Sequence, residues 1–231
     1  MCYRPLTMRR LSDFIVCTVF LFVSLLHLFA SENLIRIDNN VVRIAELVFA
    51  PHIPRTMLKQ DTNRLLVSLD AGNIQLIYAD GRKSRQHWAT GQIVWIPAGE
   101  SVTSENVGSV PMQIIEIELK SAGPVRPAAR SSELDPIAID PKHNILLLEN
   151  DEVRVFRSWR EPGTTEKMHE HVGAGRAAVL LTDLDAKVKV ADGSISLLRA
   201  SSGDVLWSGP VTHATTNLGS KKFDMIVVEV K

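Results

Sequence analysis

The sequence has little cysteine, few aromatic residues and no excess of either charge. Its only cysteines, Cys2 and Cys17, lie near the N-terminus, so the rest of the chain has neither a disulfide nor a thiolate metal ligand. Aromatic residues make up 6% of the 231 residues, and 26 basic side chains balance 26 acidic ones. Nucleic-acid-binding surfaces carry basic clusters, so this composition argues against a nucleic-acid partner.

The N-terminal segment has the pattern of an export signal. Three arginines precede the apolar run Phe14–Ala30, and polar residues follow it. A basic region, an apolar region and a small residue at the cleavage point are typical of a secretory signal peptide. The alternative is a membrane anchor formed by residues 14–30, a length near the lower limit for a span. We expect residues 1–30 to be a signal peptide or membrane anchor, and the protein to be exported (periplasmic or secreted).

The remaining chain reads as an internal repeat. Five features of the first half recur 111 or 112 positions later: Val42-Arg43 as Val153-Arg154, Asp80-Gly81 as Asp192-Gly193, Gly91 as Gly203, Trp95 as Trp207, and Asn106 with Gly108 as Asn217 with Gly219. Matches at both ends and in the middle, with a shift of one residue, predict two copies of one structural unit.

Each half consists of short apolar and β-branched runs between turn signals. Asp-Gly pairs separate such runs in both halves and are strong hairpin signals. No stretch after residue 30 has helical periodicity. Many short strands with Gly/Pro turns are typical of a sandwich or closed barrel. We expect an all-β protein with barrels in residues 33–120 and 142–231, joined by a proline-rich linker or strap, residues 121–141.

Three histidines of the second half have the spacing of a metal site. His169 and His171 are one residue apart, so on a strand both side chains point to the same face. His213, from a neighbouring strand, would complete a face of three imidazole nitrogens. Zn, Fe, Cu, Ni and Mn all accept such ligands. The alternative is that these histidines are remnants in a barrel that no longer binds metal.

With these motifs, the chain resembles the cupin superfamily in its two-barrel, or bicupin, form. The matching residues are Gly163, His169 and His171 in the first cupin motif, and Gly203, His213 and Asn217 in the second. The resemblance covers residues 33–231. It implies two double-stranded β-helix (jelly-roll) barrels in tandem, with a divalent transition metal held by the three histidines of the second.

Two departures from the cupin pattern stand out. The motif's glutamate falls at Gly175 or Arg176, and without it three histidines suit Zn, Fe(II) or Cu better than Mn(II). Arg176 can instead bind an anionic substrate group, although its counterpart Arg64 favours a shared structural role. In the first half the histidine positions align with Met57–Lys59 or Leu58–Gln60, and with Val102. The first barrel is therefore expected to be degenerate and structural.

Four further residues near the motifs have simpler interpretations. Glu170, between the two histidines, is expected to point to the opposite face of its strand. Glu166 can reach inward from its loop, but a solvated carboxylate is the simpler interpretation. Asn106 and Asn217 are expected to satisfy backbone groups after their turns.

A fold of this kind does not by itself define a function. The first hypothesis is an exported, metal-dependent enzyme of the oxygenase, isomerase or lyase type, acting on a small organic molecule in the second barrel. The second is a non-catalytic ligand-binding or structural bicupin with a decayed metal site. The expected partners are a small molecule and, as an open question, a second copy of the chain; a membrane enters only through the N-terminal segment.

Overall fold

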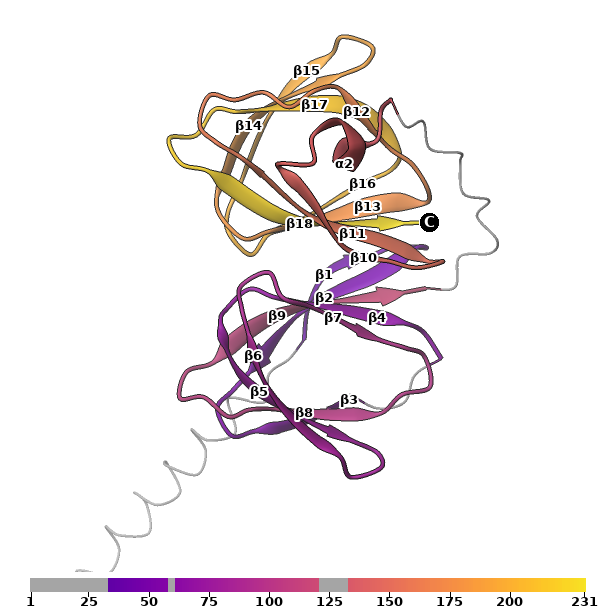
Figure 1. The fold of residues 1–231 in the computed structure, drawn as a ribbon, viewed down its shortest axis with the longest axis vertical. Helices are drawn as coiled ribbons and strands as arrows, with labels where there is room; N and C mark the ends of the chain where they lie inside the picture. Colours follow the sequence, from indigo (N-terminus) through magenta and orange to yellow (C-terminus); the bar gives the residue numbers. More distant parts are fainter. Residues whose placement is uncertain (1–32, 58–60, 121–132) are drawn as a thin grey trace, which may run out of the picture. The chain divides into compact units, whose positions relative to one another are not determined.

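The computed structural model describes residues 33–57, 61–120 and 133–231, and residues 33–231 form one compact unit. Except for the short helix α2 (Pro136–Ile139), all regular elements in these ranges are strands (Figure 1), so the expected all-β class is confirmed. The predicted leader, residues 1–30, and most of the predicted linker lie outside the described residues. Within the described ranges, no helix has the length and apolar character needed to cross a membrane.

The first half forms a barrel of two antiparallel sheets, here called the first barrel. Its five-stranded sheet has the order β1 (Leu34–Asp38), β2 (Val42–Phe49), β9 (Met112–Leu119), β4 (Arg64–Ser68) and β7 (Ile93–Ile96). Its four-stranded sheet has the order β3 (Pro54–Met57), β8 (Val102–Asn106), β5 (Gly72–Tyr78) and β6 (Lys83–Trp88). The Asp80-Gly81 turn joins β5 to β6, as predicted, with Gly81 at φ 83°.

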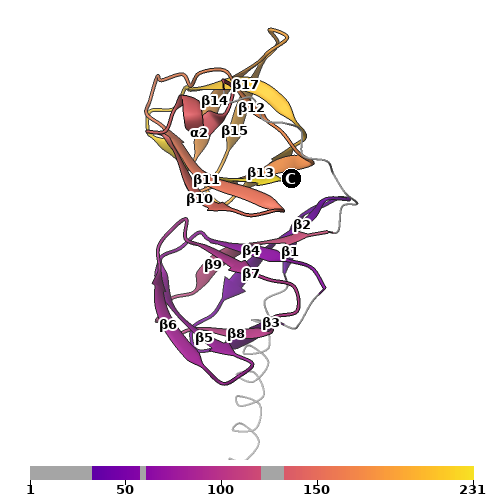
Figure 2. The same ribbon diagram turned by 45° about the vertical axis from the view of Figure 1, so that its right-hand side comes forward.

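The second half forms the second barrel with the same strand order (Figures 1 and 2). Its five-stranded sheet runs β10 (Asn144–Glu149), β11 (Val153–Arg160), β18 (Phe223–Val230), β13 (Gly175–Leu180) and β16 (Val205–Ser208). Its four-stranded sheet runs β12 (His169–His171), β17 (Val211–Asn217), β14 (Leu184–Val190) and β15 (Ile195–Ala200). The two barrels therefore correspond strand for strand.

Both faces of the central strands β9 and β18 are largely buried. In β9, Ile114 packs inside the first barrel, whereas its neighbours Ile115 and Ile117 join a cluster that also contains Ile226 and Val228 of β18. Successive strand residues face opposite ways, so one run of aliphatic residues supplies both the barrel interior and the contact between the barrels. This explains why apolar residues take consecutive positions in these strands, as in Ile114-Ile115 and Ile226–Val228, instead of strictly alternating with polar ones.

The helix α2 was not expected from the sequence. It lies within the predicted linker, and Asp135 caps it by accepting hydrogen bonds from the amides of Ile137 and Ala138. One turn is too short to produce helical periodicity, although Asp followed by Pro is a typical helix start. The segment lies against β12, where the Glu170 amide donates to the Leu134 carbonyl at 2.8 Å.

The two asparagines have the structural role expected of them. Asn217 Nδ2 donates to the carbonyls of Arg160 and Lys221, both at 2.9 Å, and its Oδ1 accepts from the Gly219 amide. Asn106 repeats this arrangement in the first barrel. In each barrel, the side chain fixes the turn that follows the strand carrying the third histidine position.

Candidate metal site

Strands β12 and β17 bring the three predicted ligands together. His169 and His171 alternate with the half-buried Glu170 on β12, and both imidazoles are buried. His169 lies opposite His213 in the antiparallel pairing of β12 with β17. Their ligand nitrogens all lie within 4.8 Å of one another. The spacing on one strand and the register of two strands thus produce the convergence predicted from sequence.

Hydrogen bonds on the outer side of two rings determine which nitrogens face inward. His171 Nδ1 donates to Glu229 Oε1 at 2.7 Å, and His169 Nδ1 donates to the Lys167 carbonyl at 3.0 Å, because these oxygens can only accept. Both Nε2 atoms then present lone pairs, and they lie 3.0 Å apart. Two such lone pairs repel each other unless a cation lies between them, so this geometry fits a metal ion.

His213 completes the same set. Its Nε2 is buried without a hydrogen-bond partner among the described residues, and Thr215 Oγ1 lies 3.4 Å from its Nδ1. Burial lowers the pKa of His213 from the ordinary 6.5, and the nearby charge of Arg176 and the imidazoles of His169 and His171 lower it further. The ring is therefore neutral near pH 7, which is the form that binds a metal.

The metal-free protein is expected to lose stability on acidification because of His213. Its folded-state pKa lies below 6.5, so below that pH the unfolded chain binds a proton that the folded chain does not, and the free energy of unfolding falls as pH falls. Well below pH 6.5 the slope from this group approaches about 1.4 kcal/mol per pH unit, and between about pH 7.5 and 5.5 the loss from this group sums to about 1.4 kcal/mol. Urea unfolding at these two pH values measures the loss. His213→Gln should reduce the loss by about that amount; an unchanged loss would refute the assignment.

Arg176 faces the interior of the second barrel. On β13, Ala177 and Val179 belong to the cluster shared between the barrels, so Arg176 points the other way. Burial lowers the pKa of Arg176, while the carboxylates of Glu166 and Glu229 act against that shift. Its Nε is buried and has no hydrogen-bond partner among the described residues.

The counterpart of Arg176 in the first barrel has a different environment. Arg64 is 2% exposed, and its Nη1 lies 3.9 Å from Glu116 Oε2. The residue at the position of Glu116 in the second barrel is Val227. The two arginines therefore share a place in the fold, but Val227 replaces the carboxylate that accompanies Arg64, and the carboxylates that act on Arg176 are Glu166 and Glu229.

Two carboxylates near the histidines were missed or misjudged from sequence. Glu166 is not solvated: its side chain is 7% exposed, binds Arg160 Nη2 at 2.8 Å, and approaches His169 Nδ1 to 3.8 Å. Glu229 was not predicted as part of the site, yet its side chain is 1% exposed and binds His171. Its position inside β18, a buried strand, was the one sequence signal available, because a buried carboxylate needs a partner.

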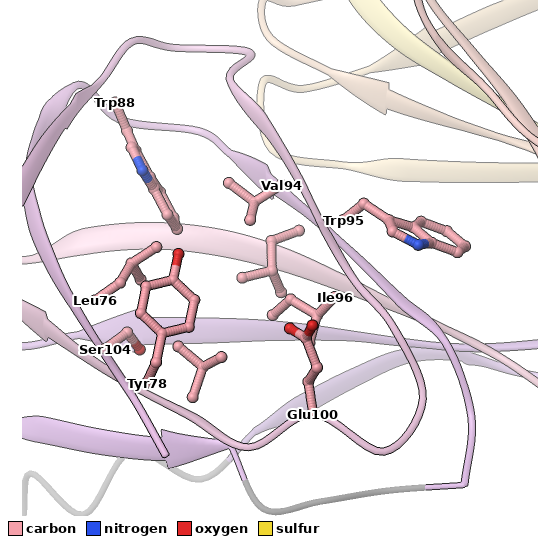
Figure 3. Close-up of a pocket in the computed structure, with 10 residues that line it drawn as sticks. Leu76, Tyr78, Trp88, Val94, Trp95, Ile96, Glu100 and Ser104 are labelled. Atoms are coloured by element: carbon pink, nitrogen blue, oxygen red, sulfur yellow. The ribbon is translucent and has the colours of Figure 1, made fainter. Parts of the chain in front are cut away.

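The first barrel lacks this arrangement. Its backbone register pairs Met57 with Val102 as the second barrel pairs His169 with His213, which favours the alignment of the histidine pair with Met57–Lys59. Val102 borders a cavity of about 70 Å³ whose walls are largely apolar and aromatic, with Tyr78 and Trp88 extending into it (Figure 3). Within the described ranges, the group of three potential metal ligands in the second barrel is the only one.

Comparison with known proteins identifies the fold. No family model and no curated protein matches the sequence. Among solved structures, a cupin 2 conserved barrel domain protein from Leptotrichia buccalis is 17% identical with a TM-score of 0.55, covering 88% of this chain and 90% of its own. AerE from Microcystis aeruginosa is 12% identical with a TM-score of 0.60, covering 87% and 97%.

A third structure adds a metal-containing example. The oxalate decarboxylase of Bacillus subtilis, described with Mn(II) centres, is 10% identical with a TM-score of 0.58, covering 87% of this chain and 75% of its own. Similarity at this level of identity establishes the fold rather than the activity. The described part of the chain has the cupin fold, as two barrels in tandem.

Proposed function

We propose that this protein binds one divalent transition metal ion in the second barrel through His169, His171 and His213. The observation that carries the proposal is the set of three buried Nε2 atoms, of which two face each other at 3.0 Å and the third has no partner among the described residues. Imidazole nitrogens suit Zn, Fe, Cu and Ni, and no thiolate is available to select among them. The Bacillus subtilis oxalate decarboxylase, with Mn(II), leaves Mn in the set.

Metal content tests this proposal. Residues 31–231, expressed without a histidine tag and purified without chelator, should contain close to one equivalent of metal by plasma mass spectrometry. The His169→Ala/His171→Ala double variant should contain almost none, because one remaining imidazole does not hold the ion. Equal metal content in both proteins would reject the site.

We further propose that the metal site acts on a small anionic organic molecule, with Arg176 binding the anionic group. A bound divalent ion would polarise a carbonyl or activate water or dioxygen at its open positions. Arg176 supplies a guanidinium inside the same barrel, where its buried Nε has no described partner and can bind a carboxylate. The alternative is a non-catalytic ligand-binding or structural bicupin, in which the same side chains would bind a ligand without turnover.

Arg176→Met separates a ligand-binding role from a structural one. Methionine removes the cost of burying the charge but also its attraction to Glu166 and Glu229, so the thermal midpoint of the metal-free variant is expected to change little. The affinity of the metal-loaded protein for acetate or formate, measured by calorimetry, should fall at least about tenfold. Lower stability with unchanged affinity would instead assign Arg176 a structural role like that of Arg64.

The remaining proposals concern the rest of the chain. The basic and apolar pattern of residues 1–30 supports export through a signal peptide, with membrane anchoring as the alternative. The shared strand order of the two barrels supports an origin of residues 33–120 and 142–231 by duplication, with residues 121–141 as the connecting strap. Fractionation of the host, with mass measurement of the mature chain, tests whether the leader is removed.

A further inference from the structure

A series of charged side chains connects His171 to the start of α2. Glu229 accepts the Nδ1 proton of His171 at 2.7 Å, and its other oxygen lies 4.0 Å from Arg154 Nη1. Arg154 Nη2 in turn donates to both carboxylate oxygens of Asp135, at 3.1 and 3.0 Å. Asp135 is the residue that caps α2. The back of one metal-site imidazole is therefore connected to the N-terminus of this helix.

A second series of side chains connects His169 to the end of α2. Glu166 Oε1 lies 3.8 Å from His169 Nδ1, and Glu166 Oε2 accepts from Arg160 Nη2 at 2.8 Å. The same Nη2 lies 3.5 Å from Asp140 Oδ2, and Asp140 is the C-cap residue of α2. Each histidine of β12 thus has a carboxylate and then an arginine on its Nδ1 side, and both series of side chains end on the same short helix.

The inner carboxylates lie behind the imidazoles rather than in front of them. Burying a carboxylate is unfavourable unless its partners compensate, yet the Glu229 side chain is 1% exposed and that of Glu166 is 7% exposed. A carboxylate at Nδ1 fixes the tautomer with Nε2 unprotonated and raises the basicity of that nitrogen. This position strengthens a ligand without occupying a coordination site.

Comparison with the first barrel, which lacks the three histidines, shows which part of this network is specific to the metal site. Arg43 and Glu118, the counterparts of Arg154 and Glu229, also approach each other, at 3.8 Å. Glu118, however, is 21% exposed and accepts from Thr62 Oγ1. The arginine–glutamate pair is therefore common to both barrels. Full burial of the glutamate and its bond to an imidazole occur in the barrel with the histidines.

We propose that Glu229 and Glu166 are positioning residues that replace, from behind the ligands, the carboxylate missing from the cupin motif, and that they couple metal binding to the docking of α2. This inference rests on the proposed metal site. A bound cation makes the His171 Nδ1 proton more acidic, so its hydrogen bond to Glu229 is stronger when metal is present. Glu166, 3.8 Å from His169 Nδ1, is attracted to the cation-bound ring by charge alone. Coupling between two binding events is reciprocal. Docking of α2 through Arg154 and Arg160 therefore raises the metal affinity by the same factor by which bound metal favours the docking.

The experiment compares Glu229→Gln with Glu118→Gln, the matched change in the first barrel. Zn²⁺ affinity is measured by competition with a chromophoric chelator. Glu229→Gln should weaken binding by about tenfold to a hundredfold, and Glu118→Gln should leave it unchanged. In the Zn²⁺-loaded protein, the His171 Nδ1 proton should resonate far downfield by NMR and move upfield in Glu229→Gln, a change that a purely structural carboxylate would not produce.

The α2 coupling has its own readout. Metal should slow hydrogen exchange at the amides of Ile139 and Asn144, whose backbone bonds close the ends of the segment, and Glu229→Gln should reduce that effect. If Glu229→Gln does not fold, Glu166→Gln gives the affinity and hydrogen-exchange measurements through the second series; the proton shift is not part of that set, because His169 Nδ1 donates to the Lys167 carbonyl. A wild-type protein without Zn²⁺ affinity would refute the metal site itself. If the wild type binds Zn²⁺, and Glu229→Gln and Glu118→Gln both keep its affinity and its His171 Nδ1 proton shift, the metal site stands and the positioning role is overturned.

Discussion

Replacing any one of His169, His171 and His213 is expected to weaken metal binding by at least about a hundredfold. Structural zinc sites have apparent binding free energies of about 10 kcal/mol or more, so each of three equal ligands accounts for about 3 kcal/mol. The three losses should be similar, because all three nitrogens converge within 4.8 Å. Direct titration with Zn²⁺ or Co²⁺, monitored by calorimetry or visible absorption, measures them.

His213→Val is the best-controlled of these variants. Valine is the residue that the first barrel has at this position, where Val102 is 5% exposed and packs in the core of that barrel. The change should therefore be compatible with folding. His87→Ala is the matched control, because His87 is an exposed residue of β6 and should leave metal affinity unaltered. Weakening of similar size in His87→Ala would show that the losses reflect general damage rather than lost ligands.

Gly173→Ala is expected to destabilise the protein by about 3 kcal/mol or more. Gly173 has φ 100°, which costs a residue with a side chain about 1–3 kcal/mol. A Cβ at this position would also overlap the backbone carbonyl oxygen of Val230, which accepts the hydrogen bond from the Ala174 amide at 2.8 Å. Relief of that overlap requires movement of β18, which carries Glu229, or of β12, which carries two histidines. Thermal and urea unfolding measure the loss.

Gly163→Ala separates the two contributions. Gly163 also has a positive φ, 71°, but a Cβ there would meet no atom within 4 Å. Its cost should be limited to the backbone conformation, about 1 kcal/mol. A Gly173→Ala variant no less stable than Gly163→Ala would show that the contact with Val230 is not tight, and metal affinity should then also be retained.

The barrels and the three histidines could be predicted from sequence because their signals are local or periodic. Alternation along a strand places His169 and His171 on one face, and the repeat together with the cupin resemblance supplies His213. Asn106 and Asn217 were predictable for the same reason, since asparagine after a strand commonly bonds the nearby backbone.

The supporting residues could not be found in this way. Glu229 meets His171 across the barrel, at a sequence separation of 58 residues, and no periodicity relates them. Glu166 was expected to be solvated because loops are usually exposed, but Arg160 holds it inside at 2.8 Å. The helix α2 is a single turn with no apolar stripe, so its packing beside β12 depends on tertiary contacts alone.

The comparison of the two barrels explains how one fold carries both a core and a site. In the first barrel, Val102 and Trp88 fill the interior, and Arg64 lies beside Glu116. In the second, His213 takes the place of Val102 and Val227 that of Glu116. Substitutions at corresponding positions thus move the polar groups of the interior, from the Arg64 and Glu116 pair in the first barrel to the histidines in the second, while the strand order is unchanged.

X-ray absorption spectroscopy of the metal-loaded protein measures directly which atoms coordinate the metal. We expect three imidazole nitrogens at about 2.0–2.1 Å for Zn²⁺, with water oxygen completing the coordination and no sulfur. In His213→Val the imidazole scattering should fall to that of two rings. A wild-type spectrum with fewer than three imidazoles, or one unchanged in His213→Val, would contradict the assignment of His169, His171 and His213 as the metal ligands.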